Sequence, residues 1–179
     1  LGYVYDDLAY YFMADYPNRL IQRLNSDVEL SEEERTRARG LIDRMVARRI
    51  SKYNAQPMEA PTLPGGYARR VLVCDQAYAD ASTVYGKVDE ARFEEMLFAA
   101  IRENPDAQII VKTHPDSSWE KSKRTGYYTH LESTERVVIL TDPVNPYTVL
   151  DMVDTVYVGT SQMGLEALFA GKKVVTFGA

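Results

Sequence analysis

Five short apolar runs in the second part of the chain constrain its fold most strongly. Each is three or four residues long, and they lie at residues 71–74, 109–111, 137–140, 156–158 and 174–177. Continuous apolar runs of this length are typical of strands that are buried on both faces, as in a parallel sheet. Helical patterns separate several of the runs, so strands and helices are expected to alternate. We therefore predict an α/β fold with a Rossmann-like parallel sheet in residues 66–179.

The intervening helices are predicted from the spacing of apolar residues. One amphipathic helix is expected around residues 93–101, and Asn104 followed by Pro105 ends it. Shorter helices are predicted at residues 146–152 and 161–170, and Gly171 follows the second one at its C′ position. Residues 75–86 are interpreted as a loop. The apolar face of the first helix consists of Phe93, Met96, Leu97, Ala100 and Ile101.

Residues 1–65 are predicted to form a helical, aromatic-rich connecting segment and linker. Ser31 and Glu34 make an S-x-x-E pattern, which predicts a capping box at the start of a helix. A short helix is predicted at residues 10–15, and Pro17 would prevent its continuation. Residues 51–70 contain several prolines and glycines, which indicates a linker or domain boundary. We place that boundary between residues 65 and 66.

Length and composition narrow the class of protein. With 179 residues, the chain is about one domain with an appendage. Its net charge of −5 argues against a general nucleic-acid binder, so no nucleic-acid partner is expected. The single cysteine, Cys74, is expected to be a small buried side chain. No stretch approaches the roughly 20 apolar residues of a membrane span. Because the chain stops directly after the run at 174–177, we expect a fragment whose last domain is truncated.

Polar residues follow two of the predicted strands and suit a phosphate. His114 and Pro115 come after the run at 109–111, and Thr160 and Ser161 come after the run at 156–158. Ligands of open α/β sheets bind at the carboxyl ends of the strands. An imidazole together with hydroxyls at a helix N-terminus can bind an anion. The alternatives are a histidine bonded to backbone and a threonine that merely caps the helix.

Three further residues are candidates for the same site. Glu166 lies in the predicted helix at 161–170, where its carboxylate could bind ribose hydroxyls or simply face solvent. Asp75 and Asp80 follow the first strand, and a carboxylate there can act as general base toward an acceptor hydroxyl. The alternative is that Asp80 caps the next turn and Asp75 is a solvated loop acid. Lys112 and Lys123 could add positive charge.

Other site types have no support in the sequence. It contains no Walker A motif, no G-x-G-x-x-G and no G-x-S-x-G. It has no cluster of cysteines and histidines with the spacing of a zinc site. A metal is therefore not expected, and a cation such as His114 would help to neutralise a leaving phosphate.

Three blocks in order resemble the capsular polysaccharide biosynthesis proteins of the KpsC/LipB type. The first is residues 71–76 (VLVCDQ), 80–82 (DAS) and 85–86 (YG). The second is residues 103–107 (ENPDA) and 111–116 (VKTHPD). The third is residues 154–157 (DTVY), 160–168 (TSQMGLEAL), 170–172 (AGK) and 177–178 (FG). The resemblance covers residues 30–179, most strongly 70–179.

The resemblance implies a retaining-type β-Kdo glycosyltransferase with two Rossmann-like domains in a GT-B-like arrangement. Its donor would be CMP-Kdo, and no other cofactor is implied. Its acceptor would be a lipid-linked one built on phosphatidylglycerol. The protein would be cytoplasmic and peripheral to the inner membrane. The histidine-proline motif of the family, shared with bacterial sialyltransferases, is associated with the CMP phosphate, and that role falls to His114 and Pro115.

Further roles follow from the same resemblance. Phosphate contacts fall to Thr160 and Ser161, and the catalytic carboxylate to Asp80. The family often has Gly or Asp before that acid, where this chain has Ala79. The family pattern also continues past Gly178, which implies that the complete active site needs residues beyond this chain. Two other classes stay open, namely a non-catalytic nucleotide-binding scaffold and a transferase or epimerase that uses another nucleotide sugar.

Overall fold

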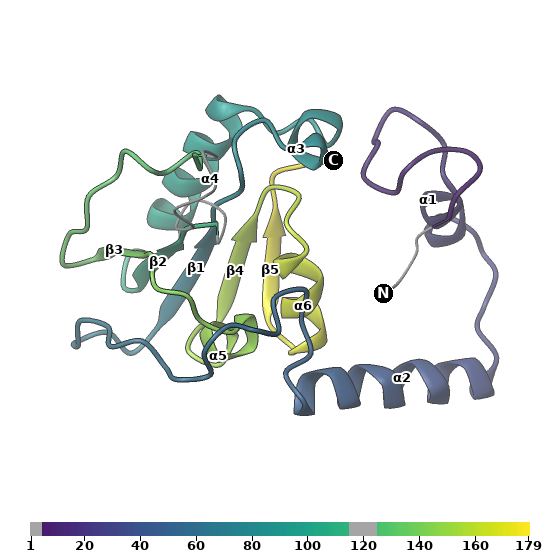
Figure 1. Ribbon diagram of the computed structural model, residues 1–179, viewed down its shortest axis with the longest axis horizontal. Helices are drawn as coiled ribbons and strands as arrows, with labels where there is room; N and C mark the ends of the chain where they lie inside the picture. Colours follow the sequence, from purple (N-terminus) through teal and green to yellow (C-terminus); the bar gives the residue numbers. More distant parts are fainter. Residues whose placement is uncertain (1–4, 115–124) are drawn as a thin grey trace.

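The sheet of the protein is parallel and has five strands. The computed structural model describes residues 5–114 and 125–179. Its strands are β1 (Arg70–Cys74), β2 (Gln108–Lys112), β3 (Val137–Leu140), β4 (Thr155–Val158) and β5 (Lys173–Thr176). They are arranged in the order β3-β2-β1-β4-β5 (Figure 1). All neighbouring strands are parallel, which confirms the predicted α/β fold with a Rossmann-like sheet.

The strand order creates a switch point beside the central strand. From β1 the chain adds β2 and β3 on one side, and then returns to the other side of β1 with β4 and β5. Val71 to Val73 pair with Thr155 to Tyr157, so β1 and β4 end side by side. In open α/β sheets, ligands bind where the connections diverge at the carboxyl ends of such strands. The fold therefore places a crevice between the loops that follow β1 and β4.

Helices cover both faces of the sheet, and alternate residues of each strand divide between them. On one face α4 (Glu90–Glu103) buries Phe93 and Met96 against Val71 and Val73. On the other face Leu72 packs with the residues of α5 (Pro146–Leu150) and α6 (Met163–Phe169). Because helices cover both faces, β1, β2 and β4 are almost wholly buried, as their continuous apolar runs predict. The edge strand β5 differs from that prediction, because its valines are half-buried and Lys173 and Thr176 are exposed.

In residues 5–65, here called the N-terminal part, the structure shows two helices, of which one was predicted correctly. In α2 (Glu32–Ala47), Ser31 Oγ accepts from the Glu34 amide at 3.2 Å, and Glu34 Oε2 accepts from the Ser31 amide at 2.8 Å. The predicted capping box is therefore confirmed. The predicted helix at 10–15 is wrong, because those residues form turns and α1 (Arg19–Leu24) begins only after Pro17, capped by Asn18 Oδ1.

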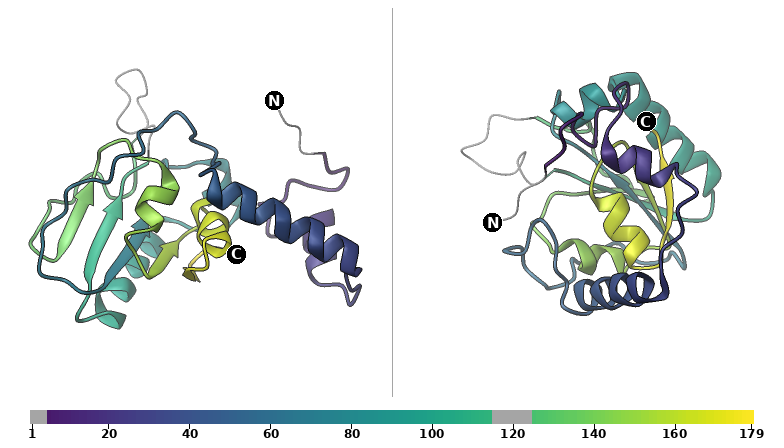
Figure 2. Two further views of the ribbon diagram at one scale, coloured as in Figure 1. Left: turned by 90° about the horizontal axis from the view of Figure 1, so that it is seen from below. Right: turned by 90° about the vertical axis from the view of Figure 1, so that its right-hand side faces the viewer.

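Helix α2 runs outward from the sheet, as Figure 2 (left) shows. None of its residues is buried within the described chain. Residues 10–15 turn back over the helix α3 (Ala81–Tyr85), where the Ala14 amide donates to the Tyr85 carbonyl at 3.2 Å and Lys87 pairs with Asp15. The boundary at residues 65 and 66 stays a prediction.

Two helix positions near the crevice differ from expectation. The segment predicted as a loop at residues 75–86 contains α3, a single short helix. Helix α6 begins at Met163 rather than at residue 161, because Ser161 Oγ accepts from the Met163 amide at 3.3 Å and so lies before the first turn. The predicted C′ glycine, Gly171, has a φ of +72°, which a glycine adopts without strain.

Candidate functional site

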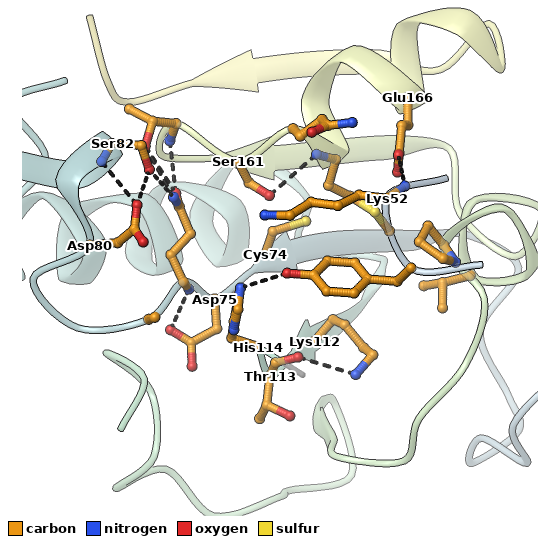
Figure 3. Close-up of a pocket in the computed structure, with 18 of the residues that line it drawn as sticks. Lys52, Cys74, Asp75, Asp80, Ser82, Lys112, Thr113, His114, Ser161 and Glu166 are labelled. Atoms are coloured by element: carbon orange, nitrogen blue, oxygen red, sulfur yellow. Dashed lines mark hydrogen bonds between the residues drawn. The ribbon is translucent and has the colours of Figure 1, made fainter. Parts of the chain in front are cut away.

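A cavity of about 270 Å³ opens at the carboxyl ends of β1, β2 and β4 (Figure 3). The loops after β1 and β4 form two of its walls, and α5 and α6 contribute a third. Residues 112–114, at the end of β2, and residues 11–12 and 52–56 of the N-terminal part complete the lining. The polar and charged residues of its lining are Lys52, Tyr53, Gln56, Asp75, Gln76, Asp80, Ser82, Lys112, Thr113, His114, Thr160, Ser161, Gln162 and Glu166.

The structure brings the predicted site residues together in this cavity. Asp80, His114, Thr160, Ser161 and Glu166 all line it, although they come from three separate loops and one helix. The predicted Pro115 lies outside the described residues, as does Lys123. The cavity thus lies where the two sequence motifs predicted a ligand, at the switch point of the sheet.

Three basic side chains face the cavity on one side. Lys112, at the end of β2, is largely buried, and burial lowers its pKa to about 8. Its Nζ donates to the Thr113 carbonyl at 3.1 Å. Lys52 Nζ lies 5.3 Å from the ring centroid of Tyr53. In the described part of the chain neither lysine forms an ion pair.

His114 meets a tyrosine from the N-terminal part. Its Nε2 lies 3.2 Å from the hydroxyl of Tyr53. The two rings stand edge to face, with centroids 6.1 Å apart and an interplanar angle of 86°. A dashed line in Figure 3 marks this bond at the labelled His114. A histidine with a side-chain partner of this kind is oriented before any ligand arrives.

Asp75 is buried, so the alternative that it is a solvated loop acid is wrong. It is 4% exposed, and burial raises its pKa to about 6. Oδ1 accepts from the amides of Gln76 and Tyr127, each at 2.8 Å. Oδ2 is buried without a hydrogen-bond partner among the described residues. A carboxylate in this state titrates nearer to neutral pH than an exposed aspartate does.

Asp80 caps the helix α3. Its Oδ1 accepts from the Ser82 amide at 2.9 Å and from Ser82 Oγ at 2.7 Å. The alternative that Asp80 caps the next turn is therefore confirmed for Oδ1. The side chain also lines the cavity. The sequence interpretation missed the helix that this cap begins because α3 is a single turn with no apolar periodicity.

Gln76 joins the loops that follow β1 and β4. Its Oε1 accepts from the Thr160 amide at 2.8 Å, and its Nε2 donates to Thr160 Oγ1 at 3.0 Å. Thr160 Oγ1 also lies 3.3 Å from Ser82 Oγ. Thr160 therefore holds two loops together and does not cap α6, for which it was the predicted alternative. The sequence signal for Gln76 was its place two positions after the end of a buried strand.

Glu166 is buried rather than facing solvent. Its side chain is 4% exposed, and burial raises its pKa. Oε1 accepts from Ser51 Oγ at 2.9 Å and from the Lys52 amide at 3.4 Å. The carboxylate thus ties α6 to a segment that the sequence indicated only as a linker. Lys52 and Tyr53 were missed for that reason, since no periodicity or motif marks them.

Two negative findings apply to the described residues. No group of three or more His, Cys, Asp or Glu side chains in residues 5–114 and 125–179 is placed to hold a metal ion. No helix in the same ranges has the length and apolar character required to cross a membrane.

Comparison with known proteins identifies relatives across the whole chain. Residues 6–179 match the family described as capsule polysaccharide biosynthesis protein. The chain is 39% identical over 178 residues to the capsule polysaccharide modification protein LipA of Neisseria meningitidis, covering 98% of this chain and 25% of that protein. It is 33% identical to the lipopolysaccharide-processing protein LpsZ of Rhizobium meliloti, covering all of this chain and 41% of that protein.

Solved structures match as well. The β-Kdo 2,4 transferase of Thermosulfurimonas dismutans KpsC superposes with a TM-score of 0.87 at 35% identity, over 97% of this chain and 53% of that chain. The β-Kdo 2,7 transferase of the same KpsC superposes with a TM-score of 0.67 at 25% identity, over 97% of this chain and 50% of that chain.

Each of these matches covers almost all of this chain but only part of the relative. The chain spans a quarter of the length of LipA and about half of each KpsC transferase structure. Its Rossmann-like sheet is half of a GT-B-like glycosyltransferase fold, as the resemblance of the three sequence blocks implied. The chain therefore belongs to the capsule polysaccharide biosynthesis protein family, of the KpsC type.

Proposed function

We propose that this chain is the nucleotide-sugar-binding part of a glycosyltransferase that transfers β-Kdo from CMP-Kdo to a lipid-linked acceptor. The solved relatives are named as β-Kdo transferases, and the family is one of capsule polysaccharide biosynthesis. The acceptor would be a phosphatidylglycerol-based lipid used for the capsule linker. The protein would then work in the cytoplasm at the periphery of the inner membrane.

One observation carries this proposal. A single cavity at the switch point of the sheet holds three basic side chains, Lys52, Lys112 and His114, together with the carboxylates of Asp75 and Asp80. Anionic donors need cations to hold the phosphate, and glycosyl transfer needs a carboxylate to accept a proton. Both requirements are met within a space of about 270 Å³.

The proposed roles divide between donor binding and catalysis. The donor phosphate would contact His114 together with the hydroxyls of Thr160 and Ser161, and Pro115 would shape the turn at the histidine. Glu166 would accept from the ribose hydroxyls through Oε2, since Oε1 already receives Ser51 Oγ. Lys112 would add a buried positive charge, whose attraction for an anion is strengthened by the low dielectric of its surroundings.

In the proposed reaction an acceptor hydroxyl oxygen bonds to the anomeric carbon of Kdo. The bond from that carbon to the phosphate oxygen breaks, and CMP leaves with the electron pair. The hydroxyl proton passes to Asp80, which lines the cavity. Asp75 is the second candidate for the proton acceptor, because its pKa of about 6 lies closer to neutral pH. The basic side chains stabilise the negative charge that grows on the departing phosphate.

Calorimetric titration with CMP tests the donor site, with UMP as the competing nucleotide. Saturable binding that prefers CMP and is lost in His114→Ala is expected. His130→Ala is the matched control, because His130 is the other histidine of the chain and is exposed. Unchanged CMP affinity in His114→Ala, with a lowered melting temperature, would show that His114 serves the fold and not the ligand.

A second titration separates this donor from others. The same protein is offered CMP, UMP and their sugar derivatives, both as this chain and as a longer chain that continues beyond residue 179. Preference for uridine nucleotides would contradict the CMP-Kdo assignment. Binding of CMP by the longer chain without any transfer of Kdo would identify a scaffold rather than an enzyme.

A further inference from the structure

We propose that Tyr53 is a positioning residue for His114, and that residues 51–56, here called the strap, belong to the functional site. The inference deepens the proposed function and rests on it in one respect, namely that His114 meets the donor phosphate. It concerns a segment that lies more than 50 residues before His114 and carries no motif. Hydrogen bonds connect α6 to the strap and the strap to His114.

A buried carboxylate holds the beginning of the strap. Ser51 is 8% exposed, and its Oγ donates to Glu166 Oε1 at 2.9 Å. The same Oγ accepts from the Tyr53 amide at 3.3 Å. The Ser51 amide donates in turn to Asn54 Oδ1 at 2.8 Å. The serine hydroxyl therefore links Glu166 of α6 directly to the backbone of Tyr53.

Helix α5 holds the chain on both sides of the strap. Before it, the Arg49 carbonyl accepts from Asn145 Nδ2 at 3.3 Å. After it, the Pro57 carbonyl accepts from the Asn145 amide at 2.7 Å. The Arg49 guanidinium also bonds to Thr148 Oγ1 at 3.1 Å and to Asp151 Oδ2 at 2.5 Å. Asn145 is therefore hydrogen-bonded to the residues on both sides of the strap, which restricts movement of the strap away from the cavity.

These anchors bring the Tyr53 hydroxyl to Nε2 of His114 at 3.2 Å. The donor in this bond depends on the tautomer of the imidazole: the tautomer that fits the proposal has the ring proton on Nδ1, and the Tyr53 hydroxyl then donates to Nε2. The bond restricts the rotation of the ring and selects its tautomer. A donor group that is already oriented loses less entropy when it binds a phosphate.

The strap also places a cation in the cavity. Lys52 Nζ lies 5.3 Å from the centroid of the Tyr53 ring, and Figure 3 shows the labelled lysine extending into the pocket near Cys74 and Ser161. The Lys52 amide is itself bound to Glu166. A single buried carboxylate therefore sets the position of both the tyrosine that orients His114 and a lysine of the cavity wall.

Histidine-selective ¹⁵N NMR tests the positioning without any nucleotide. The chain has two histidines, so His130 serves as an internal reference. In Tyr53→Phe, the ¹⁵N shifts of neutral His114 are expected to move from the Nδ1-protonated pattern toward that of an exposed imidazole, with His130 unchanged. Ser51→Ala, which removes the hydroxyl that links Glu166 to the Tyr53 amide, is expected to move them in the same direction. Unchanged His114 shifts in Tyr53→Phe would overturn the proposal.

CMP titration tests the consequence for binding. Tyr53→Phe is expected to weaken CMP binding about 5-fold to 10-fold, the effect of losing one hydrogen bond that orients a ligand group. Tyr78→Phe is the matched control, because Tyr78 is exposed and lies outside this cavity. Wild-type affinity in Tyr53→Phe would also overturn the proposal. If the unaltered protein does not bind CMP, the proposed function fails, and the NMR result alone decides the role of Tyr53.

Discussion

Gly126 lies directly against the buried carboxylate of Asp75. A Cβ at position 126 would overlap Oδ2 of that carboxylate and press on its carbon. The carboxylate cannot move aside easily, because its Oδ1 holds the amides of Gln76 and Tyr127. Glycine at this position therefore makes room for a charged group at the end of β1.

Gly126→Ala is expected to lower the free energy of unfolding by about 1–3 kcal/mol, the usual cost of overpacking a filled site. Gly40→Ala is the control, because no atom lies within 4 Å of its added Cβ and the position is inside α2. The free energy of unfolding of that variant is expected to rise by about 0.5–1 kcal/mol, since alanine stabilises a helix more than glycine does. Urea unfolding measures both, and equal effects of the two variants would contradict the close packing at Gly126.

The stability of the protein should fall as the pH rises from 4 to 6, because of Asp75. Burial raises the pKa of Asp75 from 3.8 to about 6. In this window the unfolded chain has lost the proton while the folded chain keeps it, so the folded state binds more protons. Asp75 is therefore expected to contribute about 3 kcal/mol to the free energy of unfolding below pH 4, and this contribution is lost as the pH rises through 6.

Urea unfolding of the protein and of Asp75→Asn, each at several values of pH, measures this contribution. The difference between the two should change steeply between pH 4 and 6 and level off outside that window. Asp106→Asn, at an exposed position, provides the control for the loss of one carboxylate. Parallel pH profiles for the protein and Asp75→Asn would show that Asp75 is not desolvated.

CMP affinity should decline above pH 8 because of Lys112. Burial lowers the pKa of this lysine to about 8, so the free protein begins to lose the ammonium proton there. A phosphate prefers the charged form, and the affinity therefore falls by up to tenfold for each pH unit above that point. Lys112→Met should bind CMP more weakly and with a flatter profile, whereas Lys173→Met, at the opposite end of the sheet, should match the unaltered protein. Calorimetry at pH 7 to 9.5 measures the effect, which a pH-independent affinity would refute.

Tyr157→Phe should affect stability and leave the site unchanged. The Tyr157 hydroxyl donates to Glu103 Oε2 at 2.7 Å and accepts from Asn104 Nδ2 at 3.2 Å, at the end of α4 away from the cavity. Losing both bonds is expected to cost about 1–2 kcal/mol of unfolding free energy. Tyr16→Phe, on the surface, should cost nothing measurable. Thermal unfolding and CMP titration of both variants measure these effects. Weaker CMP binding by Tyr157→Phe would contradict the prediction that Tyr157 affects stability alone.

Local patterns in the sequence predicted the elements that depend on neighbouring residues. The S-x-x-E pattern at Ser31 predicted the start of α2 because both bonds of a capping box lie within one turn. The five apolar runs predicted the strands, since the strands β1, β2 and β4 are buried on both faces and show no polar alternation. The helix α3 was missed because a single turn has no period to detect, and its only signal is the cap at Asp80.

The predicted part of the site consists of residues in the loops and in the helix that follow the strands, including Asp80 and Glu166. His114 and Thr160 follow apolar runs, and the rule for parallel sheets places them at one edge. The burial of Asp75 could not be predicted, because it depends on Gly126, which lies about 50 residues further along the chain. The role of Tyr53 depends on a bond between Ser51 and Glu166, which are separated by 115 positions.

The sequence by itself determined the α/β class, the strand positions, the helix α2 and the two loops that supply His114 and Thr160. These features follow from residues within a few positions of one another, so propensity, burial pattern and capping decide them. Only the tertiary structure decided which side chains are desolvated and which segments meet. The raised pKa of Asp75, the lowered pKa of Lys112 and the contact of Tyr53 with His114 each result from groups that folding brings together from distant parts of the chain.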